Sequence, residues 1–311
     1  MGTPDFAVPS LQVLLDGDDC VVGVVTQPDQ PAGRGMALHA PPVKVLAESH
    51  DIPVFQPAKL RVPSVLTHLQ KWQPDLIVVA AYGKLLPTTI LDLPPLGCIN
   101  VHASLLPKYR GAGPIQWALA QGETETGVTI MRISERMDSG DILLQKATPI
   151  LPYDTGGTLH DKLAPLGAEA LREALSLLKK GQLTARVQNE AEATYAPLIK
   201  KEDGRIDWTM DAESIERRIR AFNPWPSAFT TLNGKLLKIF AAQLIPPSRG
   251  QSASPGTIVE VTPVSLVIAT GRDWLALQEL QLEGKKRLPV DEFLRGHMLT
   301  PGVVFGVSPH G

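Results

Sequence analysis

The chain has 311 residues, of which 43% are hydrophobic and 20% charged, and its formal net charge is −2 at pH 7. This length exceeds what a single hydrophobic core usually supports, so two domains are expected. The near-neutral charge excludes a general electrostatic attraction to nucleic acids or membranes, so any polyanion site must be a local patch. No stretch approaches the roughly 20 apolar residues of a membrane span, and we expect no membrane association.

Cysteine and histidine are few in this chain. The two cysteines, Cys20 and Cys98, fall within apparent strands, which predicts buried thiols in a reducing compartment. We expect a cytoplasmic location of bacterial type. The seven histidines lack the paired spacing that is typical of zinc ligands. We therefore expect no zinc site of the common kind.

Up to about residue 150, short apolar runs alternate with helical segments. The runs cover 21–26, 75–81, 98–102 and 127–133, and the helical segments cover 7–15, 42–49, 63–72 and 114–120. This alternation predicts an α/β domain with a Rossmann-like, mostly parallel sheet. The opening Met1-Gly2-Thr3-Pro4 has the composition of the turn after a first strand. We therefore expect that strand to be missing and the chain to begin too late.

The second half of the chain has a different pattern. Apolar residues at helical spacing predict a long helix over 158–180, and a polar, irregular stretch follows at 182–203. A short helix is expected over 212–221. Five β-rich segments then predict a small OB-like barrel, at 229–232, 236–244, 257–261, 266–270 and 274–282. The predicted domains are 1–181, a linker at 182–203, and 204–311.

Common nucleotide and hydrolase motifs are missing from the sequence. It contains no G-x-G-x-x-G after a strand, no G-x-x-x-x-G-K-[ST] and no G-x-S-x-G. Polar side chains instead follow the apolar run 98–102, where Asn100 and His102 leave the backbone on the same side. Asp138 lies in a turn after the run 127–133, and the carboxyl ends of parallel strands meet at one edge of a sheet. We therefore expect Asp138 to approach His102.

These three side chains suit acyl transfer by direct attack of an amine. Asn100 can donate an N–H to a developing oxyanion, and His102 can add a second donor or carry a proton. Asp138 can orient the imidazole or help to remove a proton from the amine. The alternative is a structural role, because a single histidine at a strand end is more often part of the packing. Residues alone leave both interpretations open.

The segments NVHASLLPKYRGAGPIQWAL (100–119) and GVTIMRISERMDSGDIL (127–143) resemble the formyltransferase superfamily that uses 10-formyltetrahydrofolate. The resemblance implies that Asn100, His102 and Asp138 are the catalytic residues, with 10-formyltetrahydrofolate as the co-substrate and no metal. It also implies a folate-binding site that includes the turn after His102. The residues expected to bind folate are Ser104, Leu105, Leu106, Pro107, Tyr82 and Gly111.

Three further segments resemble the branch of this superfamily that formylates initiator methionyl-tRNA: 2–11, 26–44 and 219–229. The resemblance implies that the loop 28–40, with Arg34 as its central cation, contacts the acceptor stem, and that Phe6 lies near the aminoacyl end. It further implies that the barrel supports the tRNA. Basic residues of the second half, among them Lys200, Arg217 and Arg218, are candidates for phosphate contacts, although a solvated face would look the same.

Two other functions remain open from the sequence. Another enzyme of the superfamily, such as a formyltetrahydrofolate hydrolase or a sugar-nucleotide formyltransferase, would share the three catalytic residues but is expected to lack the loop 28–40. A non-catalytic tRNA-binding protein would not need Asn100, His102 and Asp138 together. We expect the protein to be a monomer that formylates the α-amino group of methionine on the initiator tRNA.

Overall fold

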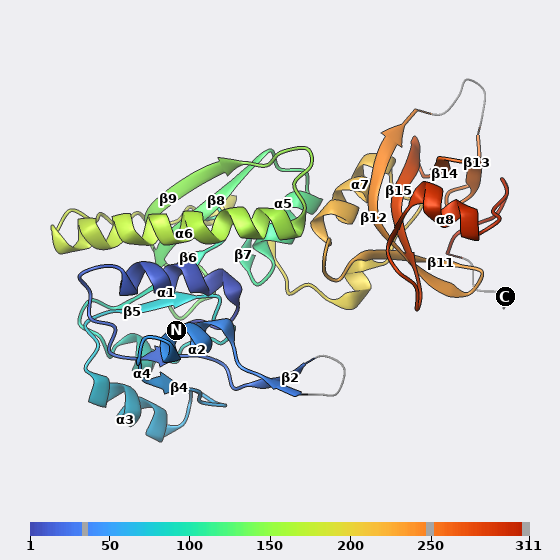
Figure 1. Ribbon diagram of the computed structural model, residues 1–311. Coiled ribbons are helices and arrows are strands. Elements are labelled where there is room, and N and C mark those ends of the chain that lie inside the picture. Colours follow the sequence, from blue (N-terminus) through green and yellow to red (C-terminus); the bar gives the residue numbers. More distant parts are fainter. Residues whose placement is uncertain (33–36, 247–251, 307–311) are drawn as a thin grey trace. The chain divides into compact units, whose positions relative to one another are not determined.

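The computed structural model describes residues 1–32, 37–246 and 252–306 (Figure 1). The chain divides into two compact units. Unit 1 comprises Met1–Pro114, Glu125–Pro149 and His160–Pro197, and unit 2 comprises Ile115–Thr124, Ile150–Leu159 and Leu198–Gly311. The domain limits expected from the sequence, 1–181, 182–203 and 204–311, stay a prediction, but 182–203 is not free of contacts. Within it, β10 (Tyr195–Ala196) pairs with β7 (Arg110–Gly111).

The main sheet of unit 1 has the strand order β5-β6-β8-β9. Its strands are β5 (Ile77–Ala80), β6 (Cys98–His102), β8 (Glu125–Arg132) and β9 (Ile142–Pro149). β5 and β6 are parallel, as the alternating pattern predicts, whereas β8 runs antiparallel to both β6 and β9. The Rossmann-like α/β prediction is confirmed, and β9 is a strand that the sequence pattern did not predict.

The first two residues of the chain lie between β5 and a second pair of strands. β1 (Val24–Val25) pairs in parallel with β4 (Val54–Phe55). The Gly2 amide donates a 3.0 Å hydrogen bond to the Val25 carbonyl, and the Ala80 amide donates to the Met1 carbonyl at 2.9 Å. Met1 and Gly2 thus join β1 to β5 by backbone hydrogen bonds, in the place where a Rossmann-like sheet has its first strand.

Helices and one short hairpin precede, connect and follow these strands in the chain. In chain order they are η1 (Asp5–Ala7), α1 (Val8–Leu15), the hairpin β2 (Gln30–Ala32) and β3 (Ala37–His39), α2 (Pro42–Glu48), α3 (Pro63–Trp72), α4 (Thr88–Leu91), α5 (Pro114–Ala120) and α6 (Gly156–Lys179). Prolines at the first turn of α1, α2 and α3 suit helix starts, because proline lacks only a donor that has no partner there.

Helix α6 approaches strand β6 closely at one glycine. A Cβ atom on Gly167 would lie 2.8 Å from the Val101 Cγ1 atom of β6. The neighbouring turns of the helix bury Leu163, Ala170 and Leu171 completely. The helical periodicity of this segment therefore reflects a buried face, and the glycine lets α6 lie directly against the strand that carries Asn100 and His102.

The two cysteines differ in their surroundings. Cys98 is buried, and burial raises the pKa of its thiol to about 12. Cys20 is exposed. The prediction of a buried thiol is therefore wrong for Cys20, because the apolar run 21–26 forms the two-residue strand β1, and this strand does not extend back to residue 20.

Unit 2 is built on an antiparallel sheet, so the predicted small β domain is confirmed. The strand order is β11-β12-β15-β14-β13, with β16 beside β15. The strands are β11 (Ala228–Leu232), β12 (Lys235–Ile245), β13 (Ile258–Thr262), β14 (Ser265–Ala269), β15 (Trp274–Leu282) and β16 (Leu288–Pro289). α7 (Ala212–Ala221) and α8 (Val290–Gly296) contribute Ile215, Ile219 and Phe293 to the core that these strands form. Two short 3₁₀ turns, η2 (Glu190–Glu192) and η3 (Lys201–Gly204), precede α7.

Residues 302–306 close this sheet toward a barrel. The Ile258 amide of β13 donates to the Val303 carbonyl at 2.8 Å, and the Phe305 amide donates to the Gly256 carbonyl at 2.8 Å. The Gly306 amide then donates to the Thr231 carbonyl of β11 at 2.9 Å. One short segment thus satisfies edge groups of the first and last strands in the sheet order, which would otherwise be open to pairing with another chain. In the described part of the chain, no helix is long and apolar enough to span a membrane.

We predict that Gly167→Val lowers the free energy of unfolding of unit 1 by about 1–3 kcal/mol, because extra methyl groups must displace Val101 or α6. Urea unfolding followed by helix circular dichroism measures this change. Ser176→Ala, at an exposed position of the same helix, is the control and should change stability by less than about 0.5 kcal/mol. Equal stability of Gly167→Val and the native protein would contradict the close packing.

Candidate active site

The buried hydroxyl of Thr129 forms hydrogen bonds with the backbone of the turn after β6. Thr129 of β8 is fully buried, and its Oγ1 donates to the Ser104 carbonyl at 2.6 Å. The same oxygen accepts from the Leu106 amide at 3.1 Å and from Gln145 Nε2 at 3.0 Å. One threonine therefore fixes the path of residues 104–106, which turn the chain away from the end of β6.

Asn100 and His102 lie two residues apart on β6, so their side chains project from the same face of the strand. The His102 Nε2 atom is 2.9 Å from the Tyr109 carbonyl oxygen. Because a carbonyl oxygen only accepts hydrogen bonds, Nε2 carries a proton. The nitrogen that is left for chemistry is therefore Nδ1. Among the residues that the structure describes, the Asn100 amide makes no side-chain hydrogen bond, so its donors are free for a ligand.

Asp138 approaches the free nitrogen of His102. Its Oδ2 atom lies 3.7 Å from His102 Nδ1 and accepts a 2.8 Å hydrogen bond from the Gly111 amide. The first distance is too long for a hydrogen bond, but it is short enough for electrostatic attraction when the imidazole is protonated. Asp138 itself has a φ of 48°, a left-handed conformation that is uncommon outside glycine and is often found at functional sites.

The expected meeting of Asp138 and His102 is present, but the reason given for it from the sequence is wrong. β8 runs antiparallel to β6, and the Ile133 amide at its end donates to the Cys98 carbonyl at the start of β6. The carboxyl ends of these two strands therefore do not share an edge. Asp138 reaches His102 from the loop 133–141 that follows β8.

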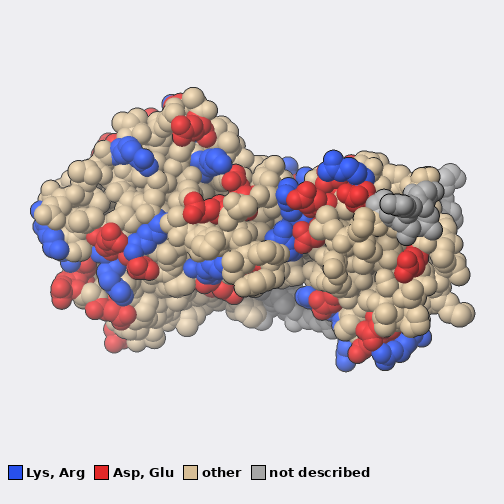
Figure 2. Space-filling model, turned by 90° about the horizontal axis from the view of Figure 1, so that it is seen from above, with Lys and Arg blue, Asp and Glu red and all other residues tan. Residues whose placement is uncertain are grey.

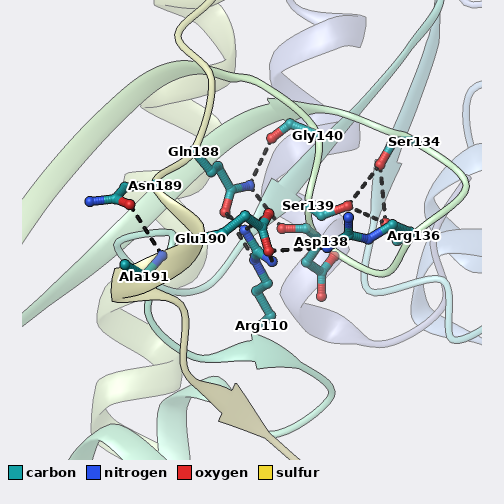
Figure 3. Close-up of polar contacts among 10 residues, drawn as sticks. All are labelled: Arg110, Ser134, Arg136, Asp138, Ser139, Gly140, Gln188, Asn189, Glu190 and Ala191. Atoms are coloured by element: carbon teal, nitrogen blue, oxygen red, sulfur yellow. Dashed lines mark hydrogen bonds and ion pairs between the residues drawn. The ribbon is translucent and has the colours of Figure 1, made fainter.

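A buried arginine supports this loop. Arg110 is 1% exposed, and its guanidinium donates to the Gln188 Oε1 atom from Nε at 3.0 Å and from NH2 at 2.8 Å (Figure 3). Two further hydrogen bonds, at 3.1 and 3.0 Å, go to the carboxylate of Glu190, which also pairs with Arg136. Hydrogen bonding to Arg110 lowers the pKa of Glu190, and the same bond raises the pKa of Arg110. A buried charge is tolerated when it is paired in this way.

The residues expected to bind folate divide into two groups. Leu105, Pro107 and Gly111 are partly exposed. Ser104, Leu106 and Tyr82 are buried: the Ser104 hydroxyl donates to the Lys108 carbonyl at 2.7 Å, and Leu106 packs against Met131 and Ile142. Tyr82 lies in the core of unit 1, where burial raises the pKa of its phenol to about 12. Direct contact with a ligand stays a prediction for all six.

The residues expected near tRNA in unit 1 are Phe6 and Arg34. Phe6 is 6% exposed, and its ring meets the edge of the His160 ring at 5.5 Å between centroids. Its contact with an aminoacyl group stays a prediction. Arg34 lies outside the described residues. The base of its loop is anchored by Asp29, which pairs with Lys44 at 2.9 Å and accepts from Gln56 at 2.7 Å.

Basic side chains of unit 2 are partly paired with carboxylates. Arg217 pairs with Glu213 one helical turn away, and Arg218 is half-buried on the same helix. Lys200 is exposed. On the face that Figure 2 shows, basic and acidic side chains lie next to one another with uncharged areas between them. Their role in phosphate binding stays a prediction. No group of His, Cys, Asp or Glu side chains in the described ranges is arranged to hold a metal ion.

Comparison with known proteins adds the family. A model of the formyl transferase family matches residues 1–175, and a model of the formyl transferase C-terminal domain matches residues 198–298. The chain belongs to the formyl transferase family. A methionyl-tRNA formyltransferase from Syntrophus aciditrophicus (strain SB) is 52% identical over 98% of this chain and 97% of its own. Another, from Desulfotalea psychrophila (strain LSv54 / DSM 12343), is 54% identical over 95% of this chain and 91% of its own.

Among solved structures, this formyl transferase resembles an N-formyltransferase from Helicobacter canadensis in complex with folinic acid and dTDP-3-aminofucose. The TM-score is 0.64 at 18% identity, over 89% of this chain and 97% of that one. At this identity the likeness concerns the fold. The family assignment that the sequence motifs predict is therefore confirmed by the full-length relatives, and the fold by the structural neighbour.

The residues that support the candidate active site from outside the motifs were not predicted from the sequence. Gln188 and Glu190 fall in the stretch expected to be a linker, and Thr129 lies inside an apolar strand. Arg110 lies inside the segment 100–119, and no role was predicted for it. A weak signal was present, because an arginine between Tyr109 and the glycine-rich loop needs a partner if the turn is packed.

We predict that Glu190→Gln destabilises the protein more at pH 7 than at about pH 3. The pKa of Glu190 is lowered in the folded protein, so its contribution is fully present above the ordinary glutamate pKa of about 4.3 and is lost as the pH falls through the lower folded-state pKa. Thermal melting of both proteins at both pH values measures this. Glu192→Gln serves as the control, since the Glu192 carboxylate accepts from Asn189 and the side chain is exposed. A difference of equal size at both pH values would argue against the ion pair.

Proposed function

We propose that the chain transfers a formyl group from 10-formyltetrahydrofolate to the α-amino group of methionine esterified to the initiator tRNA. The observation that carries this proposal is the 52% identity over 98% of the chain to a protein named methionyl-tRNA formyltransferase. Residues expected to do the chemistry lie in segments of the chain that match the formyl transferase family model.

Folate chemistry is supported by the family and by a neighbour. The Helicobacter canadensis N-formyltransferase, which shares the fold, is described in complex with folinic acid. In our proposal the partly exposed Leu105, Pro107 and Gly111 border the folate, while Ser104 and Leu106 shape the turn from the inside. Tyr82 contributes to the site by packing beneath it. The proposed reaction uses no metal.

The first step is attack of the free amine on the formyl carbon. A tetrahedral centre forms, and negative charge develops on the formyl oxygen. Asn100 donates an amide N–H to this oxygen. In this proposal His102 acts as the imidazolium, so that Nε2 donates to the Tyr109 carbonyl and Nδ1 donates to the formyl oxygen. Such donors act strongly because they are fixed before the charge appears.

The second step moves a proton from the attacking nitrogen and breaks the bond between the formyl carbon and N10 of the folate. Asp138 lies 3.7 Å from His102 and is anchored by the Gly111 amide. We assign to Asp138 the removal of the amine proton, either directly or through a water molecule. N10 receives a proton as it leaves, so charge is conserved over the reaction.

The two rival functions have less support. The two relatives named methionyl-tRNA formyltransferase are 52% and 54% identical to this chain. The Helicobacter canadensis N-formyltransferase, which is described in complex with dTDP-3-aminofucose, is 18% identical. A non-catalytic tRNA-binding protein gives no reason for His102 and Asp138 to lie 3.7 Å apart. The proposal also includes a cytoplasmic location, where charged initiator tRNA is found, and a monomeric state.

We predict that Asn100→Ala, His102→Ala and Asp138→Ala each lower kcat for methionyl-tRNA formylation by about 100-fold or more, as expected for the loss of an oxyanion donor or a proton acceptor. A radiolabelled formyl transfer assay measures this. Glu125→Gln, an exposed carboxylate on β8, is the control and should retain activity. Activity close to the native level in any of the three alanine variants would refute its assigned role.

The acceptor is tested by comparing initiator methionyl-tRNA, elongator methionyl-tRNA and water under the same conditions. The proposal predicts rapid transfer to the initiator form and slow transfer to the other two. Equal rates with water and with initiator methionyl-tRNA would instead favour a hydrolase of the same family.

We predict that Arg34→Ala impairs use of methionyl-tRNA more than binding of the folate, and that the defect is larger at low salt than at high salt. The reason is that contacts between a cation and phosphates weaken as salt is added. KM values for both substrates at two salt concentrations measure this. Arg61→Ala, an exposed arginine before α3, is the control. Equal losses for both substrates would exclude a role in tRNA binding.

A further inference from the structure

A segment that the sequence presented as a linker lies against the catalytic loop. We call residues 186–196 the strap. At one end the Arg186 amide and carbonyl pair with Ile142, and at the other end β10 pairs with β7 in parallel register, Tyr195 with Arg110 and Ala196 with Gly111. The strap therefore belongs to unit 1. One of its ends is hydrogen-bonded to Ile142, just after the loop that carries Asp138, and the other end to β7, whose Gly111 amide binds Asp138.

Both the oxygen and the nitrogen of the Gln188 side-chain amide form hydrogen bonds. Its Oε1 atom accepts two hydrogen bonds from Arg110, at 3.0 and 2.8 Å. Its Nε2 atom donates to the Asp138 carbonyl at 2.8 Å and to the Gly140 carbonyl at 2.7 Å. Gln188 is 5% exposed, so these four bonds leave no donor or acceptor of the amide without a partner (Figure 3).

The two groups that define the position of the Asp138 carboxylate are both fixed by the strap. Gln188 holds the backbone of Asp138, and β10 holds Gly111, whose amide binds the carboxylate at 2.8 Å. At Gly111 the fit is close, because a Cβ atom would lie 2.5 Å from the Ala196 carbonyl oxygen. The left-handed φ of Asp138 is maintained by these contacts, since isolated non-glycine residues avoid that conformation.

We propose that Gln188 is a positioning residue that sets the distance between Asp138 and His102. The effect of Gln188 on catalysis rests on the proposed function, whereas its effect on the position of Asp138 does not. Gln188 acts through the backbone of Asp138 and does not touch the reacting atoms. The buried Arg110 sets the place of Gln188, because its guanidinium donates two hydrogen bonds to the Gln188 Oε1 atom.

The test is Gln188→Glu, which keeps the shape of the side chain and an acceptor for Arg110 but removes both donors to the Asp138 loop. We expect kcat for formylation to fall about 10- to 100-fold, the size of effect that a displacement of about 1 Å can produce. KM for both substrates should change by less than about twofold, since binding groups are untouched. Asn189→Ala is the matched control, because Asn189 bonds within the strap, to Ala191 and Glu192.

A double-mutant cycle distinguishes positioning from general damage. In the background of Asp138→Asn, Gln188→Glu should lower kcat by less than about twofold more, because residues that act through one another are not additive. If the two losses multiply, or if Gln188→Glu has kcat close to the native value, the proposal is overturned. Should Gln188→Glu not fold, Gln188→Asn, which keeps both bond types on a shorter stem, is measured instead.

Hydrogen exchange gives a readout independent of activity. The Gly111 amide should exchange faster in Gln188→Glu than in the native protein or in Asn189→Ala, because its acceptor is no longer held. Unchanged exchange at Gly111 would overturn the geometric part of the proposal. If the native chain formylates no methionyl-tRNA, the proposed function fails, and hydrogen exchange alone then decides whether Gln188 fixes the Asp138 loop.

Discussion

The carboxylate of Asp138 joins three segments that are distant in the sequence. The carboxylate accepts a hydrogen bond from the Gly111 amide in the loop after β6, and it faces His102 on β6 itself. The backbone carbonyl of Asp138 accepts a hydrogen bond from Gln188 in the strap. If any of these contacts were lost, the distance between carboxylate and imidazole would no longer be fixed. The proposed chemistry depends on that distance, because a proton or a developing charge is stabilised only by groups that are already in position.

Arg110 explains how such an arrangement is held in the interior. A buried guanidinium is unfavourable unless each of its donors is paired, and here Gln188 and Glu190 supply the acceptors. The pairing gives little reason to expect a large gain in stability, since bringing a charge out of water offsets the attraction. Its consequence is geometric: the strap can take one position against the loop, and the loop one position against β6.

Elements with a strong periodic signal were predictable from the sequence. The helix over 212–221 and the strand over 274–282 agree with α7 and β15, and the long helix agrees with α6 to within two residues at its start. β9 was missed because its side chains are mostly half-buried, which weakens the alternation. β7 and β10 have two residues each, too few for any pattern.

The sequence predicted the polar residues of the candidate site better than the residues that hold them in position. Asn100, His102 and Asp138 stand out because polar side chains follow apolar strands, and motif resemblance then assigns them roles. The orientation of Ser104 and Tyr82 could not be predicted, because turn geometry decides whether a side chain faces a ligand or the core. Gln188 could not be predicted either, since its partners are 48 to 78 residues away in the chain.

In the proposed reaction, the side chains of Asn100, His102 and Asp138 surround one formyl carbon. A crystal structure of the protein with a stable 10-formyl folate analogue tests it most directly. We expect the formyl oxygen within about 3.2 Å of Asn100 Nδ2 and His102 Nδ1, with Asp138 still bound to the Gly111 amide. A formyl group bound away from Asn100, with the His102 ring making no contact to it, would contradict the account.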